Sequence, residues 1–304
     1  MTQSVPRWHA ELVLVGITLI WGGTFAIVKE AVVAISPFLF TGVRFLLALA
    51  LVGLVWRGSF HRWHPHTLRH GLLLGLLLSG GFLLQTLGLQ YTTASRSAFI
   101  TGATVALVPL FQLLLQRRPV AAWEWLGAAM TLVGLWQLSN PELGQWNPGD
   151  LLTVASTLFW ATYIVVLDTV TRSTVTAFNT SVQLTFVQFA VVACAGLATY
   201  GIVVSTAPPG TERGLSSLLM PTVWVALAYT AVLASLIAML AQTHYQRFTT
   251  PVRATLLYSL EPVFASAIAW GFLGERLTQH EFVGAGLILV GIAIAQFFGI
   301  YCRS

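Results

Sequence analysis

Residues 71–91 read GLLLGLLLSGGFLLQTLGLQY, a run without a single Asp, Glu, Lys or Arg. A lipid bilayer offers the backbone no hydrogen-bond partner, so a segment that crosses it is either a helix or a strand of a closed barrel. Barrel strands give short segments of alternating polarity. This run is continuous and about as long as the ~20 residues that a helix needs to cross the bilayer. The run therefore predicts a transmembrane helix.

Nine further apolar runs of similar length flank this one on both sides. Together the expected spans are 10–28, 38–56, 71–91, 95–115, 121–138, 150–168, 177–204, 220–240, 251–273 and 281–300. The first run is interpreted as a span, not a signal peptide, because only Arg7 precedes it and no small-residue cleavage site follows before Lys29. Ten such helices leave loops too short for an extramembrane domain.

The composition agrees with a chain that has lipid as its main solvent. Of the 304 residues, 56% are hydrophobic and 8% are charged, and that charged fraction is about a third of the usual one. A soluble domain cannot cover its surface with so few charges, which excludes a water-soluble enzyme and a nucleic-acid-binding module. We expect an all-α integral membrane protein whose partners are the lipid bilayer and a small molecule. Cys194 and Cys302 do not indicate a disulfide.

The distribution of Lys and Arg predicts the orientation of the chain. Residues on the N-terminal side of the spans are Arg7, Arg57, Arg62, Arg69, Arg117, Arg118, Arg172, Arg247, Arg253 and Arg303. The opposite side carries Lys29, Arg96, Arg213 and Arg276. Because cytoplasmic loops are enriched in basic residues, ten against four places both termini in the cytoplasm. We expect a multi-pass protein of the bacterial inner membrane.

The two halves of the chain carry the same short patterns in the same order. Residues 12–21 and 151–160 share Leu, Val, Thr-Leu and Trp at equal spacing. Residues 124–134 and 281–291 share Glu-x-x-Gly-Ala-x-x-x-Leu-Val-Gly. Between these patterns, Pro109 corresponds to Pro262.

Each half holds five spans, so the second half must enter the membrane from the opposite side. The sequence therefore predicts two inverted five-helix repeats, residues 1–140 and residues 141–304. Inverted repeats are typical of secondary transporters, which bind substrate near the bilayer midplane between the halves. The alternative is a duplication kept only for helix packing.

Several motifs resemble the EamA domain of the drug/metabolite transporter superfamily over essentially the whole chain. The most specific are YSLEPVFAS at 258–266 and WGFLGERLT at 270–278. The first half departs from the family at 116–119, where QRRP replaces the expected Gly-Glu-Arg. Residues 97–102, SAFITG, with Val-Pro-Leu at 108–110, look most like the YddG-type exporters. This resemblance implies a ten-helix inner-membrane protein that exports amino acids, aromatic ones included.

Charged and proline residues inside the spans are candidates for the transport machinery. Glu261 is the carboxylate deepest within a span, so it is a candidate for proton coupling or recognition of an amine; the alternative is a structural hydrogen bond to backbone freed by Pro262. Pro109 and Pro262 each remove one helical hydrogen bond, which predicts hinges beside a cavity or ordinary packing kinks. Arg44 is a candidate for attracting a substrate carboxylate, although its long stem could instead reach toward the head groups.

Aromatic and polar side chains at matched or midplane positions are candidates to line a substrate cavity. These residues are Trp21, Gln85, Phe99, Thr101, Trp160, Tyr163 and Tyr258. Aromatic faces bind apolar side chains and attract ammonium groups. Each could equally be a packing residue.

Other functions have weaker support in the sequence. The four histidines between His61 and His70 could chelate a metal, but this basic stretch is expected to be a solvated loop, and we expect no metal or cofactor. Motifs of membrane proteases and hydrolases are absent from the sequence, which argues against an enzyme. The favoured function is an alternating-access amino-acid exporter. The alternatives are a broad-specificity efflux carrier and a channel-like pore, and monomer and homodimer both remain open.

Overall fold

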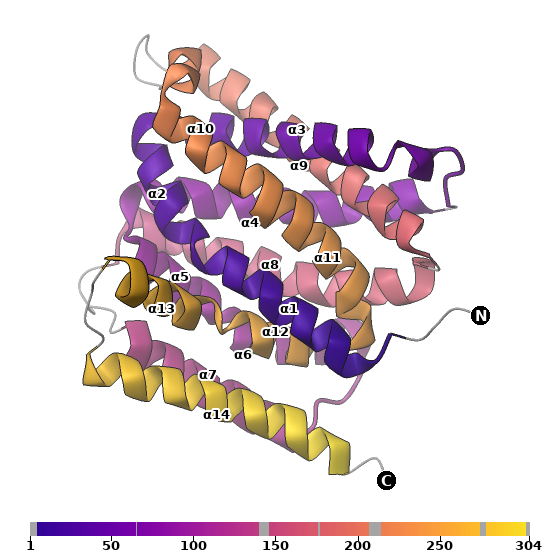
Figure 1. The fold of residues 1–304 in the computed structure, drawn as a ribbon, viewed down its shortest axis with the longest axis vertical. Coiled ribbons are helices and arrows are strands. Elements are labelled where there is room, and N and C mark those ends of the chain that lie inside the picture. Colours follow the sequence, from indigo (N-terminus) through magenta and orange to yellow (C-terminus); the bar gives the residue numbers. More distant parts are fainter. Residues whose placement is uncertain are drawn as a thin grey trace.

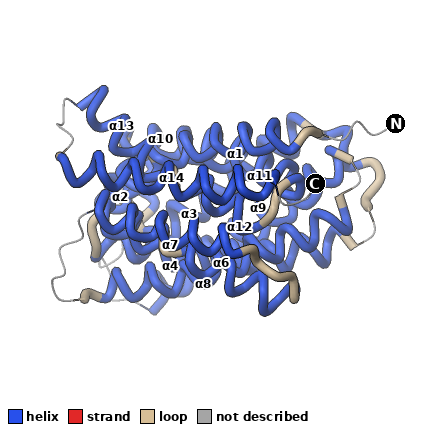
Figure 2. Tube along the Cα trace, turned by 90° about the horizontal axis from the view of Figure 1, so that it is seen from below, coloured by secondary structure: helices blue, strands red, loops and turns tan. Residues whose placement is uncertain are grey.

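The computed structural model describes residues 5–64, 66–139, 146–175, 177–206, 214–273 and 278–301. Every regular element in these ranges is helical (Figures 1 and 2). The α-helices are α1 Arg7–Gly22, α2 Thr24–Ala34, α3 Pro37–Val55, α4 Thr67–Tyr91, α5 Ala94–Gly102, α6 Thr104–Phe111, α7 Ala122–Ser139, α8 Pro148–Thr174, α9 Phe178–Thr206, α10 Pro221–Ala228, α11 Ala238–Tyr245, α12 Pro251–Tyr258, α13 Glu261–Leu273 and α14 Gln279–Tyr301. Shorter 3₁₀ or π segments are η1 Arg57–Phe60, η2 Gln112–Gln116, η3 Leu215–Leu219, η4 Tyr229–Ile237 and η5 Gln246–Phe248.

Consecutive elements join into long rods. Eight of these rods are long and apolar enough to cross a membrane, which confirms an all-helical, multi-pass membrane protein among the described residues. Two further rods, α7 and the interrupted pair α12–α13, lie beside them. That all ten rods cross the bilayer remains a prediction.

Local sequence chemistry determines where several rods begin. At the start of α8 the Asn147 side chain accepts from the Asp150 backbone N–H at 3.0 Å, and the Asp150 carboxylate accepts from the Asn147 N–H at 3.0 Å. This reciprocal pair is a capping box, and Pro148 follows it at the first helical position, where a missing N–H costs nothing. Thr93 and Thr250 cap α5 and α12 in the same way with their hydroxyls.

The rods are arranged as two outer pairs and two inner groups. The outer pairs are α3 with α9 and α7 with α14, which lie at the top and bottom of Figure 1. Between them, α4, α5 and α6 pack on α8, and we call these four helices the α8 group. Helices α11, α12 and α13 pack on α1, which continues into α2, and we call these five helices the α1 group. Each group combines helices from both halves of the chain.

Helices α7 and α14 cross at glycines that come from matched positions of the two sequence patterns. A Cβ atom on Gly127 would lie 2.5 Å from the carbonyl oxygen of Gly291, and one on Gly134 would lie 2.7 Å from that of Gly284. Any larger residue at these positions would push the two backbones apart. The glycines therefore allow the close crossing of these two helices.

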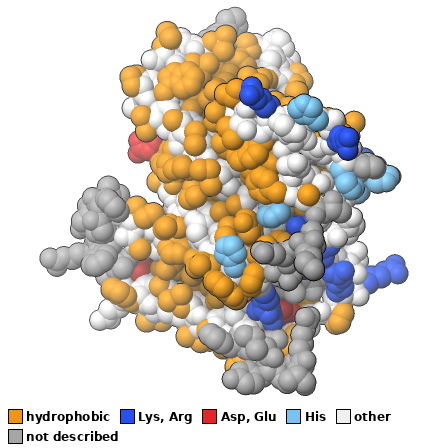
Figure 3. Space-filling model, turned by 45° about the vertical axis from the view of Figure 1, so that its right-hand side comes forward, with side chains coloured by type: hydrophobic (Ala, Val, Ile, Leu, Met, Phe, Trp, Pro, Cys, Tyr) orange, Lys and Arg blue, Asp and Glu red, His pale blue; other side chains and the backbone are white. Residues whose placement is uncertain are grey.

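Both chain ends lie at the same end of the rods (Figure 1). The guanidinium of Arg7 in α1 donates to the side-chain oxygen of Gln296 in α14 at 2.7 Å. We call this end the terminus face and the other end the opposite face. Lys, Arg and His side chains gather toward the terminus face (Figure 3). Of the basic residues counted above, Arg213, Arg276 and Arg303 lie outside the described residues.

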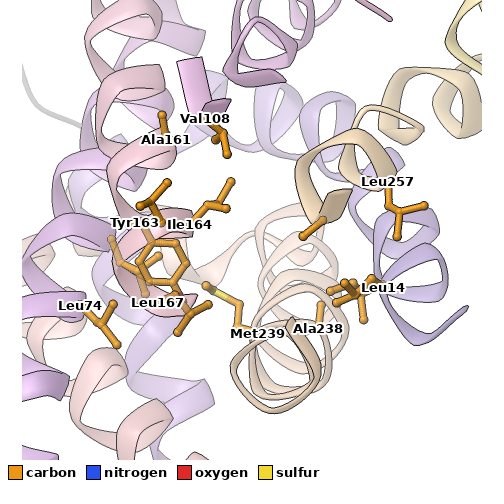
Figure 4. Close-up of a cluster of buried hydrophobic side chains, with 14 of the residues drawn as sticks. Leu14, Leu74, Val108, Ala161, Tyr163, Ile164, Leu167, Ala238, Met239 and Leu257 are labelled. Atoms are coloured by element: carbon orange, nitrogen blue, oxygen red, sulfur yellow. The ribbon is translucent and has the colours of Figure 1, made fainter. Parts of the chain in front are cut away.

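A buried hydrophobic cluster fills the space between the two groups toward the terminus face (Figure 4). Tyr163, Ile164 and Leu167 of α8 lie near Met239 and Ala238 of α11 there, and Leu14 of α1 joins the same cluster. Ala161, Tyr163, Leu167 and Ala238 have no exposed surface. The packing closes the molecule on this side of the site described next.

Candidate functional site

A cavity lies between the α8 group and the α1 group. Its free space, counted to its mouth, is about 1000 Å³, which is within the usual range for small-molecule sites. Five of the seven predicted lining residues are found in its wall: Trp21, Gln85, Thr101, Trp160 and Tyr258. Arg44, Glu261 and Pro262 also line it, whereas Pro109 does not.

Two predicted lining residues, Phe99 and Tyr163, do not line this cavity. Phe99 packs on Trp136 of α7 with their ring centroids 5.6 Å apart. Tyr163 is fully buried, and its hydroxyl donates to Gln188 of α9 at 3.0 Å. Successive helical residues are rotated by about 100°, so Phe99 and Thr101 point in nearly opposite directions. Tyr163 is likewise turned away from Trp160 by about 60°.

The two repeat-matched tryptophans form opposing parts of the wall. The indole N–H of Trp21 donates to the carbonyl of Ala234 at 3.1 Å, and its ring lies edge-on to Tyr258 with centroids 5.4 Å apart. Trp160 lies edge-on to Phe82 with centroids 4.7 Å apart. The Trp160 indole N–H is buried without a partner among the described residues. It is an unused donor at the cavity wall.

Arg44 is buried within the helix bundle, away from the head groups. Its Nε donates to the hydroxyl of Ser235 at 2.8 Å. Its guanidinium carbon lies 4.9 Å from the ring centroid of Phe82 and 5.2 Å from that of Phe45, close enough for cation–π attraction. No described carboxylate forms an ion pair with it. The positive charge is therefore available to an anionic group in the cavity.

Glu261 presents the complementary charge in the same wall. It begins α13, immediately before Pro262, and its carboxylate forms no hydrogen bond or ion pair with any other described residue. An isolated carboxylate within a membrane-spanning rod is costly unless water or a ligand solvates it. The backbone passes close to α1 here, since a Cβ on Gly22 would lie 3.1 Å from the Glu261 carbonyl oxygen.

The helix interruptions lie near the two prolines but not at them. The break between α5 and α6 falls at Ala103, and the break between α12 and α13 falls at Ser259 and Leu260. Pro262 lies in the first turn of α13, where its missing N–H breaks no helical bond. Pro109 lies inside α6, just before the π segment η2. The predicted hinge positions therefore shift to the breaks, which both lie about midway along their rods.

Sequence reasoning missed the polar groups at the terminus side of the cavity. The Gln246 side-chain oxygen accepts from Gln242 and from the Tyr258 hydroxyl, each at 3.1 Å, and its amide donates to the Ile164 carbonyl at 2.8 Å. The side-chain oxygen of Gln242 is buried without a partner among the described residues. Buried glutamines near the end of an apolar span were the available signal.

Ion pairs near the rod ends were also missed, because their partners are distant in sequence. Asp150 pairs with Arg96 at 2.9 Å on the opposite face. On the terminus face Asp168 pairs with Arg172 at 2.7 Å, and Glu124 pairs with Arg253 at 3.1 Å. Among the described residues no three His, Cys, Asp or Glu side chains come together as a metal site requires.

Comparison with known proteins agrees with this architecture. The chain matches the EamA-like transporter family over residues 8–140 and 147–297. An uncharacterized transporter of Archaeoglobus fulgidus is 30% identical over 97% of this chain and 88% of its own length. The uncharacterized inner membrane transporter YedA of Escherichia coli K12 is 26% identical over 96% of this chain and 91% of its own length.

A solved crystal structure superposes with a TM-score of 0.74, covers 96% of this chain and 98% of its own, and shares 20% sequence identity. That likeness shows the fold. The family match confirms the resemblance noted in the sequence at the level of the family and identifies a transporter. The chain belongs to the EamA-like transporter family.

Proposed function

We propose that this chain is a secondary transporter that exports amino acids across the bacterial inner membrane by alternating access through the cavity. One observation carries the proposal: a buried arginine and a glutamate, neither ion-paired with another described residue, line one aromatic-walled cavity. A free amino acid carries a carboxylate and an ammonium group. It therefore supplies a partner for each of the two unpaired charges.

The walls favour an amphiphilic substrate over a purely polar one. Trp21, Phe25, Phe82, Trp160 and Tyr258 surround the two charges. Aromatic faces contact apolar side chains and also attract an ammonium group. This combination supports aromatic and other neutral amino acids as substrates, in line with the resemblance to the YddG-type exporters.

Symmetric contacts support the inverted repeat of residues 1–140 and 141–304. Gly127 corresponds in sequence to Gly284, and Gly134 corresponds to Gly291. The observed contacts pair Gly127 with Gly291 and Gly134 with Gly284, so exchanging the halves converts one contact into the other. A two-fold axis in the membrane plane produces this relation, and it is the symmetry that alternating access uses.

The tryptophans obey the same exchange. Trp21 contacts Ala234, and a Cβ on Gly81 would lie 3.0 Å from the ring of Trp160. Trp21 corresponds to Trp160, and Gly81 precedes Ala234 by 153 residues, an offset within the repeat spacing. The cavity therefore lies close to the proposed axis. Ten crossings with both termini in the cytoplasm follow from this arrangement together with the basic terminus face.

Two rival functions share the same fold. A broad-specificity drug or metabolite efflux carrier would use the aromatic walls without requiring both charges. A channel-like pore would conduct without alternating its opening between the two faces. The sequence contains no Walker-type phosphate loop, so the proposed energy source is the substrate gradient or coupled proton movement.

Counterflow in proteoliposomes tests the proposal. Labelled phenylalanine, leucine and alanine should each accumulate in vesicles preloaded with unlabelled substrate, with saturation. Competition by N-acetyl and by amide derivatives then probes the two charges separately. We expect Arg44→Gln to weaken recognition of amino acids but not of the amides, and Glu261→Gln to weaken recognition of amino acids but not of the N-acetyl compounds.

A matched control is Arg57→Gln, which removes an exposed positive charge on the terminus face and should leave all affinities unchanged. Equal loss for all competitors in the two cavity variants would favour the broad-specificity carrier. Conduction without trans-stimulation would favour the pore.

A further inference from the structure

Two threonines, one on each face, occupy matching places in the two halves. Thr92 follows α4 on the opposite face, and Thr249 follows η5 on the terminus face. They are 157 residues apart, and each is followed directly by the threonine that caps the next helix, Thr93 or Thr250. Each therefore lies between the third and fourth rods of its half.

The hydroxyl of each threonine holds one inner group together. Thr92 donates to the carboxylate of Asp150 in α8 at 2.7 Å, and this bond lies within the α8 group. Thr249 donates to the carboxylate of Glu11 in α1 at 3.0 Å, within the α1 group. Glu11 and Asp150 are separated by 139 residues, the same offset as Trp21 and Trp160. Exchanging the halves converts one bond into the other.

The carbonyl of each threonine faces the other group. The Thr92 carbonyl accepts from the ammonium of Lys29 in α2 at 2.8 Å, and Lys29 also donates to the Leu89 carbonyl at 2.6 Å. The Thr249 carbonyl accepts from the guanidinium of Arg172 in α8 at 2.5 Å. Carbonyls at a helix end lack intrahelical partners and attract cations. Each face thus has one cation that bridges the two groups across the cavity axis.

We propose that these two bridges are the latches that alternate during transport. The opposite-face latch is Lys29 with the carbonyls of Leu89 and Thr92, and the terminus-face latch is Arg172 with the carbonyl of Thr249. Opening the cavity to a face requires the groups to separate there, which breaks that latch and leaves the other in place. The threonine hydroxyl bonds stay made throughout, because they lie within each group.

The neighbouring charges fit this division of roles. Arg172 also pairs with Asp168 of its own helix, and Asp168 lies 3.7 Å from Arg118, so that cluster keeps its internal pairs when the Thr249 bond breaks. Arg96 pairs with Asp150 inside the α8 group. The latch proposal rests on alternating access, but it is independent of which substrate is carried.

Accessibility of a single cysteine tests the latches directly. Cys194 and Cys302 are replaced by alanine, and Thr24→Cys places one thiol in the cavity wall. A membrane-impermeant methanethiosulfonate is then applied to right-side-out and to inside-out vesicles. Lys29→Gln should raise the labelling rate from the opposite face at least about fivefold, and Arg172→Gln should do so from the terminus face.

Conservative and matched variants accompany this test. Lys29→Arg and Arg172→Lys keep a donor and should label at the parent rate. Asp168→Asn changes the same cluster without removing the latch and should also label at the parent rate. Because Arg172→Gln leaves buried Asp168 short of a partner, Asp168→Asn/Arg172→Gln is made alongside it and should reproduce the terminus-face effect.

Labelling that rises equally from both faces, or in neither latch variant, would overturn the latches. If the shifts are reciprocal while no amino acid shows counterflow, the latches stand and the substrate assignment falls. If counterflow is normal while the latch variants label like the parent, the latches fall and the transport function stands.

Discussion

Replacing Gly284 by alanine should weaken the crossing of α7 and α14. The added Cβ would lie 2.4 Å from the Leu138 backbone nitrogen and 2.7 Å from the Gly134 carbonyl oxygen. Ordinary contact begins at 3.4 Å, so the two backbones must separate by roughly 1 Å. Forced separation of well-packed elements costs about 1–3 kcal/mol. We expect the melting temperature of the purified protein to fall by several degrees.

Gly286, two residues along the same helix, provides the control. A Cβ there meets nothing within 4 Å, so Gly286→Ala should melt at the parent temperature or slightly above it. Both variants are compared by thermal unfolding in the same detergent, with monodispersity checked by size-exclusion chromatography. Equal melting temperatures for the two variants would show that the close glycine crossing does not determine this contact.

Four further outcomes follow from the described contacts. Glu124→Leu should destabilise the protein by about 3 kcal/mol because it leaves buried Arg253 unpaired, and Glu124→Leu/Arg253→Met should recover most of that loss in thermal unfolding. Asp150→Ala should lower the melting temperature more than Asp150→Asn, because the amide still accepts a capping bond at the start of α8. Trp160→Ala should raise the KM for phenylalanine about tenfold in counterflow and that for alanine far less, whereas Trp136→Ala, outside the cavity, should change neither. Single cysteines at Arg62 and Trp146 should label from opposite sides of the membrane, and labelling from one side would refute the assigned faces.

The helical rods were predictable because lipid-facing and core-facing positions are both apolar, which leaves long runs visible in the sequence. The family was predictable because motifs such as YSLEPVFAS keep their residues at fixed spacing. The interruptions within rods were harder to place. Proline suggests a break, but the break before α13 falls at Ser259 and Leu260, whose residue types do not announce it.

The candidate site was only partly predictable, because its members must share depth as well as direction. Trp21 and Trp160 were identified through the repeat, which carries both kinds of information. Phe99 and Tyr163 were chosen for residue type and depth, and their rotation about the helix axis turns them into packing contacts. Partners such as Arg44 and Ser235 lie 191 residues apart, a separation that no local pattern encodes.

Neither charge in the cavity wall has a counterpart in the other half of the chain. Gln183, the approximate match of Arg44, instead bonds to the carbonyls of Ser59 and Arg62 in a loop on the terminus face. Thr104 precedes Glu261 by 157 residues and is uncharged. A carrier built on a two-fold frame thus has a polar binding pocket, and half-saturation should differ between influx and efflux. At zero gradient the two fluxes still balance, so this asymmetry changes kinetics without changing the equilibrium.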